Sequence, residues 1–150
     1  MRKTIIILSV LACCTLSCVS TQTTTSSGQK TTDPMLAPMK LNGSWQLEEI
    51  PGARVAYTDK KPMISFDVSN NKFAGNTSCN NFSGLLVVYG SRINFNKSMA
   101  MTKMACLGDG ESTFVESLKK VDSYTVNADN SLTLSAGDTV VMRLVKIIKQ

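Results

Sequence analysis

Short runs of alternating apolar and polar residues fill the chain from Leu41 onward, and they restrict its fold more than any other feature. The runs lie at residues 44–47, 64–68, 93–95, 132–134 and 140–145. Alternation with a period of two is typical of strands with one buried and one exposed face. Clusters of Gly, Pro, Asn, Asp and Ser separate the runs, as tight turns require. The pattern predicts a mainly β domain of about seven or eight antiparallel strands, arranged as a β-barrel-like sheet or a sandwich.

The run at residues 84–89 (GLLVVY) breaks this alternation, because it is apolar throughout. A strand that is covered on both faces has such a continuous apolar composition. We therefore expect residues 84–89 to form a central strand of the sheet, or a strand buried on both faces.

Residues 111–121 (ESTFVESLKKV) carry helical periodicity instead. Phe114 and Leu118 lie one helical turn apart, which gives the segment one apolar face. Asp109 or Ser112 is placed to cap its first turn. We expect one α-helix here, packed against the sheet.

The first residues have the layout of an export signal. Arg2 and Lys3 precede a largely apolar stretch, residues 5–16, and no hydrophobic stop-transfer run follows it. The stretch is too short to cross a bilayer, for which about 20 apolar residues are needed. These features predict a secretory signal peptide, which is removed from the mature protein.

Two cysteines follow a small residue, as the lipid acceptor of a lipoprotein signal does. Cleavage before Cys18 removes 17 residues, whereas cleavage before Cys13 removes only 12, shorter than the roughly 15 residues expected for export. We favour Cys18 as the lipidated residue, with Cys13 as the alternative and cleavage without a lipid as a third interpretation. A cysteine that carries two or three acyl chains anchors a protein stably to a membrane.

Residues 20–33 contain only Ser, Thr, Gln, Gly, Lys and Asp. Such a segment cannot bury enough apolar surface to offset its chain entropy. The predicted organisation is a signal peptide at residues 1–17, a flexible Ser/Thr-rich tether at 18–39 and one domain at 40–150. A short O-glycosylated stalk is the alternative reading of the tether.

The chain contains no histidine, which excludes Ser-His-Asp and Cys-His catalytic arrangements and removes the commonest metal ligand. The formal net charge of +5 includes Arg2 and Lys3 of the signal, and the remaining charges are interspersed. Without a basic block, no nucleic-acid partner is expected. We also expect no metal, no cofactor and a monomeric domain.

Cys79 and Cys106 remain after the signal is removed. Exported proteins occupy an oxidising compartment, where disulfides form. Neither cysteine belongs to a CxxC pair, so a zinc site is not expected. A disulfide between them would stabilise the fold by about 3–4 kcal/mol in the chain-entropy model. A reactive or redox-active thiol is the alternative.

Three segments of the domain resemble the motifs of one family. Residues 41–47 (LNGSWQL) match L-x-G-x-W-x-L, residues 75–84 (GNTSCNNFSG) match G-x-x-x-C-N-x-F-x-G, and residues 100–106 (AMTKMAC) match A-x-T-x-M-x-C. In this order they resemble the META (HslJ-like) domain family over about residues 41–145. The chain departs from the pattern at Ser78, where many members have Gly before the cysteine.

The resemblance implies an antiparallel β-barrel-like or sandwich domain with one packed helix, and it implies no set of catalytic residues. It also implies a cell-envelope location, in the outer membrane and facing the periplasm or the surface, with a role in envelope stress. We expect structural roles for the motif residues Trp45, Asn80, Phe82, Gly84, Thr102 and Met104.

Methionines occur at positions 99, 101 and 104, in the order of a copper-binding stripe. Their spacing does not keep all three on one face of a strand. Packing in the core or at its edge is therefore the favoured interpretation.

These observations predict a non-enzymatic envelope lipoprotein, a binding or structural module that contributes to envelope stress or drug tolerance. The membrane, through the lipid, and an unknown protein are its expected partners. The alternative is an inhibitor or assembly-factor module that docks a secreted enzyme or an envelope complex through exposed edges and loops. A glycan hydrolase that uses two of its acidic residues is the least favoured interpretation. Those acids are Glu48, Glu49, Asp59 and Asp67.

The lipid site is testable by labelling the full-length protein with a radioactive fatty acid in cells that export it. We expect Cys18→Ala to abolish incorporation, because it removes the thiol of the predicted mature N-terminus. Cys13→Ala is the matched control and should label normally. Labelling lost only in Cys13→Ala would assign the alternative site, and unchanged labelling in both variants would exclude both cysteines.

Overall fold

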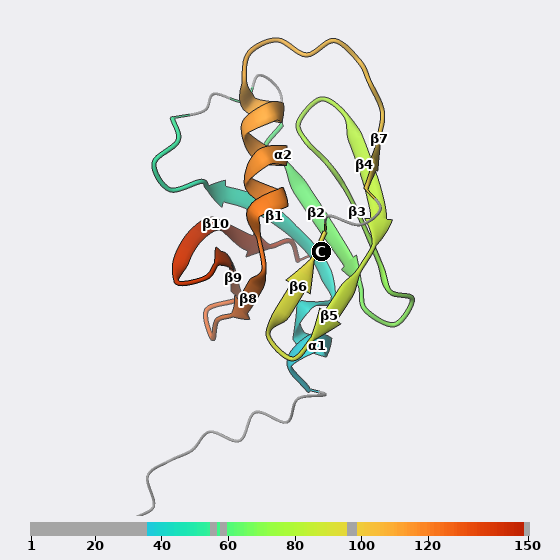
Figure 1. Cartoon of the computed structure of the whole chain (residues 1–150), viewed down its shortest axis with the longest axis vertical. Helices are drawn as coiled ribbons and strands as arrows, with labels where there is room; N and C mark the ends of the chain where they lie inside the picture. Colours follow the sequence, from blue (N-terminus) through green and yellow to red (C-terminus); the bar gives the residue numbers. More distant parts are fainter. Residues whose placement is uncertain (1–35, 55–56, 58–59, 96–98, 149–150) are drawn as a thin grey trace, which may run out of the picture. The chain divides into compact units, whose positions relative to one another are not determined.

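The computed structural model describes residues 36–54, 57, 60–95 and 99–148 (Figure 1). The predicted signal peptide, both candidate lipid sites and most of the predicted tether lie outside these residues. All of the described residues belong to one unit of the chain. Neither helix of this part of the chain has the length and apolar character needed to cross a membrane.

The described residues form one antiparallel sheet and two helices. The helices are α1 (Leu36–Leu41) and α2 (Gly110–Lys120). The strands are β1 (Gly43–Glu49), β2 (Met63–Asp67), β3 (Lys72–Asn76), β4 (Asn81–Leu85), β5 (Val87–Tyr89), β6 (Arg92–Asn94), β7 (Ala100–Met101), β8 (Ser123–Val126), β9 (Ser131–Ala136) and β10 (Thr139–Lys146). The predicted mainly β fold is confirmed, but the strand count of ten exceeds seven or eight. The strands that lie outside the alternating runs are β3, β7 and β8, and the apolar run 84–89 is divided between β4 and β5.

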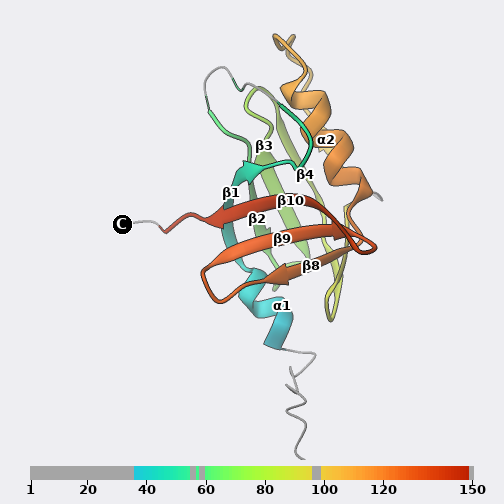
Figure 2. The ribbon, with the colours of Figure 1, turned by 90° about the vertical axis from the view of Figure 1, so that its left-hand side faces the viewer.

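The sheet is curled into a half-barrel. Its strand order is β5-β6-β8-β9-β10-β1-β2-β3-β4-β7, so the first and last long strands, β1 and β10, pair in the middle. Only Leu86 separates β4 from β5 along the chain, yet the two strands lie near opposite ends of this order. One residue cannot span a flat sheet of this width, so the sheet has to bend back on itself. Figure 2 shows β1 and β8–β10 in front of β3 and β4, as the two walls of the curl.

The prediction for residues 84–89 is wrong. The run is divided between the end of β4 and β5, and β5 is an end strand of the sheet. Leu86 is buried, but Leu85, Val87 and Tyr89 are exposed, because they face away from the curl. Apolar composition alone does not distinguish a strand covered on both faces from one with an exposed apolar row.

The domain begins earlier than predicted. Residues 36–39, assigned from the sequence to the tether, lie in α1. The last residue of this helix, Leu41, is fully buried, and its carbonyl oxygen accepts a hydrogen bond of 2.8 Å from the indole N–H of Trp45. Lys146 of β10 covers the same indole, with Nζ 5.0 Å from the ring centroid. A buried indole needs a partner for its N–H, and α1 supplies it.

The core fills the inside of the curl and contains all five phenylalanines of the chain in one connected row. Neighbouring ring centroids along the row Phe66, Phe95, Phe73, Phe82 and Phe114 are 5.1–6.2 Å apart. Such aromatic pairs add to the stability gained from burial. The row links β2, β3 and β4 to α2, and α2 also contacts β10 on the other wall.

The predicted late helix is present as α2, which buries Phe114, Val115 and Leu118. The predicted capping is wrong. Asp109 occupies the N-cap position, but its side chain makes no capping hydrogen bond. The hydroxyl of Ser112 donates instead to the Asp109 carbonyl oxygen, at 2.9 Å. Capping depends on local backbone geometry, which the residue type alone does not fix.

Gly75 is needed where β3 packs against the core. It pairs with Phe82 of β4, and a Cβ atom at this position would lie 2.5 Å from Cζ of that ring and overlap the Met63 carbonyl oxygen. The ring therefore occupies the space that a side chain would take. Backbone cannot move aside as a flexible side chain can, so overpacking here is costly.

We predict that Gly75→Ala lowers the free energy of unfolding by about 2 kcal/mol, the usual cost of overpacking. Urea denaturation of the full chain, followed by far-ultraviolet circular dichroism, measures the effect. Ala74→Ser on the exposed face of the same strand also adds one heavy atom, and should leave the midpoint nearly unchanged. Equal midpoints for the two variants would contradict the packing role of Gly75.

Candidate functional site

Thr77 closes the hairpin loop between β3 and β4, residues 77–80. Its amide N–H donates to the carbonyl oxygen of Asn80 at 2.8 Å. Its hydroxyl oxygen accepts from the Asn80 amide at 2.9 Å and from the Cys79 amide at 3.4 Å. A hydroxyl that bonds the backbone a few residues further on fixes a turn. The loop therefore holds Cys79 and Asn80 in defined positions.

The side-chain amide of Asn80 is the centre of the hydrogen-bond network, and this residue is 1% exposed. Its Oδ1 accepts from the Thr102 hydroxyl and from the Met104 N–H, each at 2.8 Å. Its Nδ2 donates to the Met104 carbonyl oxygen and to Oε1 of Glu111, each at 3.1 Å. Both ends of the amide are paired, which fixes its orientation. One side chain thus joins the hairpin loop, the segment 102–106 and the start of α2.

A disulfide joins Cys79 to Cys106, with an S–S distance of 2.03 Å and a Cα–Cα distance of 6.1 Å. The predicted bridge is present. The two sulfurs and a carboxylate oxygen of Glu111 lie within 4.8 Å of one another, a spacing that a metal ion can bridge. Sulfur binds metals as a thiolate, and the disulfide has none. In the oxidised protein the two cysteines and Glu111 therefore line the site without forming a metal-binding set.

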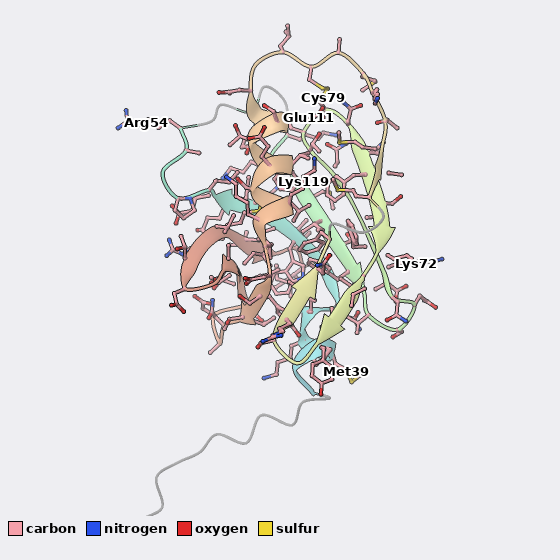
Figure 3. All side chains as sticks on the ribbon, viewed as in Figure 1. Met39, Arg54, Lys72, Cys79, Glu111 and Lys119 are labelled. Atoms are coloured by element: carbon pink, nitrogen blue, oxygen red, sulfur yellow. A yellow bond between two sulfur atoms is a disulfide. The ribbon has the colours of Figure 1, made fainter. Side chains whose placement is uncertain are left out.

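Glu111 extends from the first turn of α2 toward the hairpin loop, and Figure 3 shows it close to Cys79. The Thr77 hydroxyl donates to its Oε2 at 2.5 Å. Arg143 forms an ion pair with Glu49, and no ion pair with Glu111 is found among the described residues. The site thus contains a half-buried carboxylate that is hydrogen-bonded but has no counter-ion within the described part of the chain.

A cavity of about 280 Å³ lies beside this carboxylate. Its lining consists of Tyr57, Thr77, Ser78, Cys79, Met104, Ala105, Cys106, Leu107, Gly110 and Glu111. The hydroxyl oxygen of Tyr57 is buried and has no hydrogen-bond partner within the described part of the chain. Burial, and then the negative charge of Asp109, raise the pKa of Tyr57 above its ordinary value of 10.0. The phenol is therefore a neutral, unused donor at neutral pH.

Comparison with models of known protein families identifies the family of this chain. The META domain family model matches residues 37–147, nearly the whole described domain. The chain belongs to the META domain family. The match agrees with the residue pattern, because the C-N-x-F-x-G and A-x-T-x-M-x-C segments contribute Asn80, Thr102, Met104 and both cysteines to one network.

Three solved structures resemble this META domain. An NMR structure with 27% sequence identity has a TM-score of 0.55, over 71% of this chain and 92% of that chain. An NMR structure from Burkholderia xenovorans is 16% identical, with a TM-score of 0.59 over 75% and 87%. The crystal structure of a duf4847 family protein from Bacteroides vulgatus is 14% identical, with a TM-score of 0.53 over 75% and 97%. The last two show similarity of fold alone. Comparison with curated proteins gives no match.

The META motif residues outside the network lie in the core and on β4. Trp45 and Phe82 are buried, and Gly84 is half-buried. Met104 is different, because its backbone bonds to Asn80 while its side chain is 63% exposed. Met99 and Met101 pack partly buried against the core. The three methionine side chains therefore do not share one environment.

The acidic residues considered from the sequence do not gather at the cavity. Glu49 pairs with Arg143, and Glu48 and Asp67 are exposed on the sheet. Asp59 lies outside the described residues. Hydrogen bonds from Asn70 hold the pKa of Asp67 below its ordinary value.

Sequence reasoning missed three residues of the site. Thr77 lies inside the C-N motif segment but carries no signal of its own, and Glu111 was considered only as the start of a helix. Their hydrogen bond joins residues 34 positions apart. Tyr57, in the loop between β1 and β2, gave no signal, because only the tertiary structure brings it to the cavity.

The backbone conformation of Ser78, the position at which the chain departs from the META pattern, is unusual for a residue other than glycine. Its φ of +89° lies in the left-handed region, which favours glycine. Asn71 and Asn130 also have positive φ, at +53° and +60°, but asparagine tolerates that conformation. Ser78 therefore holds strain at the position where many members of the family have Gly.

We predict that Ser78→Gly raises the free energy of unfolding by about 1 kcal/mol, the strain relieved minus the added entropy of the unfolded chain. Asn71→Gly is the control and should be neutral or slightly destabilising. Urea denaturation of the oxidised full chain gives both values. A Ser78→Gly midpoint no higher than that of Asn71→Gly would show that the turn is unstrained.

Proposed function

We propose that this META domain is a non-enzymatic, lipid-anchored binding module of the cell envelope that contributes to envelope stress or drug tolerance. Its binding site in this proposal is the cavity beside the Cys79–Cys106 disulfide. The observation that carries the proposal is the carboxylate of Glu111, which lines a cavity and has no ion-pair partner among the described residues. Tyr57 also lines the cavity, and its buried hydroxyl has no hydrogen-bond partner among the described residues.

The lining favours a ligand with a cationic amine on an apolar stem. Each carboxylate oxygen of Glu111 accepts one hydrogen bond from the protein and keeps further acceptor capacity. An ammonium group supplies both the missing charge and the donors. Met104, Leu107 and the disulfide provide apolar contacts for the stem. A cavity of about 280 Å³ suits one alkyl-ammonium group, such as a lysine side chain, better than a drug-sized molecule.

The site argues for binding rather than catalysis. Glu111 is the one carboxylate among the described residues of the lining, whereas glycoside hydrolysis needs two acids that flank the bond. A general acid needs a raised pKa, and the pKa of Asp67 is lowered. Asn80 is held at both ends of its amide by structural hydrogen bonds, so it has no free group for a substrate.

A second candidate, an inhibitor or assembly-factor module, has one observation in its favour. The segment 102–106 is fixed by Asn80 and by the disulfide, yet Met104 within it is 63% exposed and the adjacent Leu107 is 88% exposed. Exposed apolar side chains on a rigid loop are suited to docking into a partner, because little entropy is lost on binding. Docking of this kind would not depend on the charge of Glu111.

The amine site is testable by NMR titration of the detergent-solubilised full chain with n-butylammonium chloride. We expect saturable shifts of amide signals around Thr77, Cys106 and Glu111. In Glu111→Gln the affinity should fall at least about tenfold, because a charge-assisted hydrogen bond contributes about 1.5–3 kcal/mol.

Glu116→Gln removes an exposed acid of the same helix and is the matched control, with unchanged affinity expected. n-Butanol, which has the same stem without the charge, should bind far more weakly than the amine. Equal affinity in wild type and Glu111→Gln would contradict the amine site and favour docking through the loop.

A further inference from the structure

The apolar run at residues 84–89 has no role in the site described above, yet its arrangement is regular. From β4 into β5 the side chains alternate between the core and the outside, and the outer row reads Asn81, Ser83, Leu85, Val87 and Tyr89. The row is polar at one end and apolar at the other. Its apolar members are 56–85% exposed, which is unusual for three neighbours in one row.

Two hydrogen bonds connect this apolar end to the start of the domain. The side-chain oxygen of Asn42, just after α1, accepts from the Val68 amide at 2.7 Å. The carbonyl oxygen of Asn71 accepts from the Leu86 amide at 2.8 Å. The turn between β2 and β3 thus ties α1 to the β4–β5 junction. Both views show α1 at the same end of the domain as β5 and β6 (Figures 1 and 2).

Further exposed side chains on this end have the composition of a membrane interface. Met39 in α1 is 67% exposed and lies at the end of the domain in Figure 3. Lys72 pairs with Leu85 across the sheet, and Arg92 pairs with Tyr89. Aromatic, apolar and basic side chains together are typical of surfaces that rest at lipid headgroups. The acids near these cations are Asp67, beside Lys72, and Asp122, beside Arg92.

The position of the predicted lipid anchor indicates that the membrane is the partner of this apolar surface. The described chain begins at Leu36 in α1, so everything before it joins the domain at this end. A flexible chain of the length from Cys18 to Leu36 would have a root-mean-square span of roughly 20–25 Å. A lipid anchor at Cys18 would then hold the domain within about its own diameter of the bilayer, and at that effective concentration weak contacts suffice.

We propose that the row Leu85, Val87 and Tyr89, together with Met39, rests on the surface of the bilayer that carries the lipid anchor. This inference depends on the lipid anchor of the proposed function, but not on the amine site. The contact orients the domain, so that Tyr89 lies at the depth of the lipid headgroups. The loop that precedes α2 lies at the other end of the domain (Figure 1), so in this orientation it would face away from the bilayer.

Tyr89→Trp in the lipidated mature chain provides the test. Tyr89 is 85% exposed, so the substitution should not disturb folding, and the native Trp45 is fully buried. The protein is reconstituted into phosphatidylethanolamine–phosphatidylglycerol vesicles with or without brominated acyl chains, which quench nearby indoles. We expect the bromines to quench most of the emission added at position 89. Leu107→Trp, exposed at the far end, is the control and should remain unquenched.

A second pair of variants tests the apolar row itself. Val87→Asp, added to Tyr89→Trp, should abolish the quenching, whereas Ser83→Asp on the polar part of the same row should leave it intact. Protein that floats with the vesicles but shows no quenching at position 89 would overturn the membrane contact and leave the anchor standing. Protein that does not float with the vesicles would refute the anchor. Emission changes that depend on the number of protein molecules per vesicle, and that occur equally without bromine, would show that β5 pairs between two copies of the chain. That result would also overturn the membrane contact.

Discussion

The covalent continuity of β4 and β5 is the constraint on which this META domain depends. A single residue, Leu86, joins two strands that lie near opposite ends of the strand order. The sheet can satisfy both the connection and its ladder of hydrogen bonds only by curling, and the curl creates an inside. The row of phenylalanines fills that inside, and Phe114 connects α2 to it. An apolar core, a half-barrel and a helix that bridges its walls therefore follow from one short connection.

The candidate site is held by two independent connections between the same segments. The disulfide links Cys79 to Cys106 covalently, and the neighbouring Asn80 binds both backbone groups of Met104. A buried amide with every group paired specifies one arrangement, because any other leaves a donor or acceptor unsatisfied. The amide network and the disulfide both hold the loop, and the disulfide also restricts the unfolded chain. The two connections together explain how the segment 102–106 can be rigid in a small domain although most of its side chains are exposed.

The sequence allows the long strands to be predicted because alternation reports directly which face is buried. It fails for β3, β7 and β8, which lie outside the alternating runs, and for the outer face of residues 85–89, where exposed side chains are apolar. The family motifs singled out Asn80, Thr102 and the two cysteines, because each motif is a short segment in which these residues are neighbours in the sequence. Glu111 and Tyr57 could not be recognised as site residues. Their positions depend on contacts between distant segments, such as the bond between Glu111 and Thr77, which no local pattern encodes.

The exposed apolar row of β4 and β5 and the cavity beside Glu111 lie at different ends of the domain, so contact at one end leaves the other accessible. The outer row of β4 and β5 is close to α1, where the preceding chain joins. The cavity lies instead at the β3–β4 loop and the start of α2. A domain that rests on a bilayer by the first end presents the second to the aqueous space. A partner that carries an exposed amine then reaches Glu111 without competition from lipid headgroups. Orientation by a few apolar side chains would thus increase the accessibility of the cavity without any change in its chemistry.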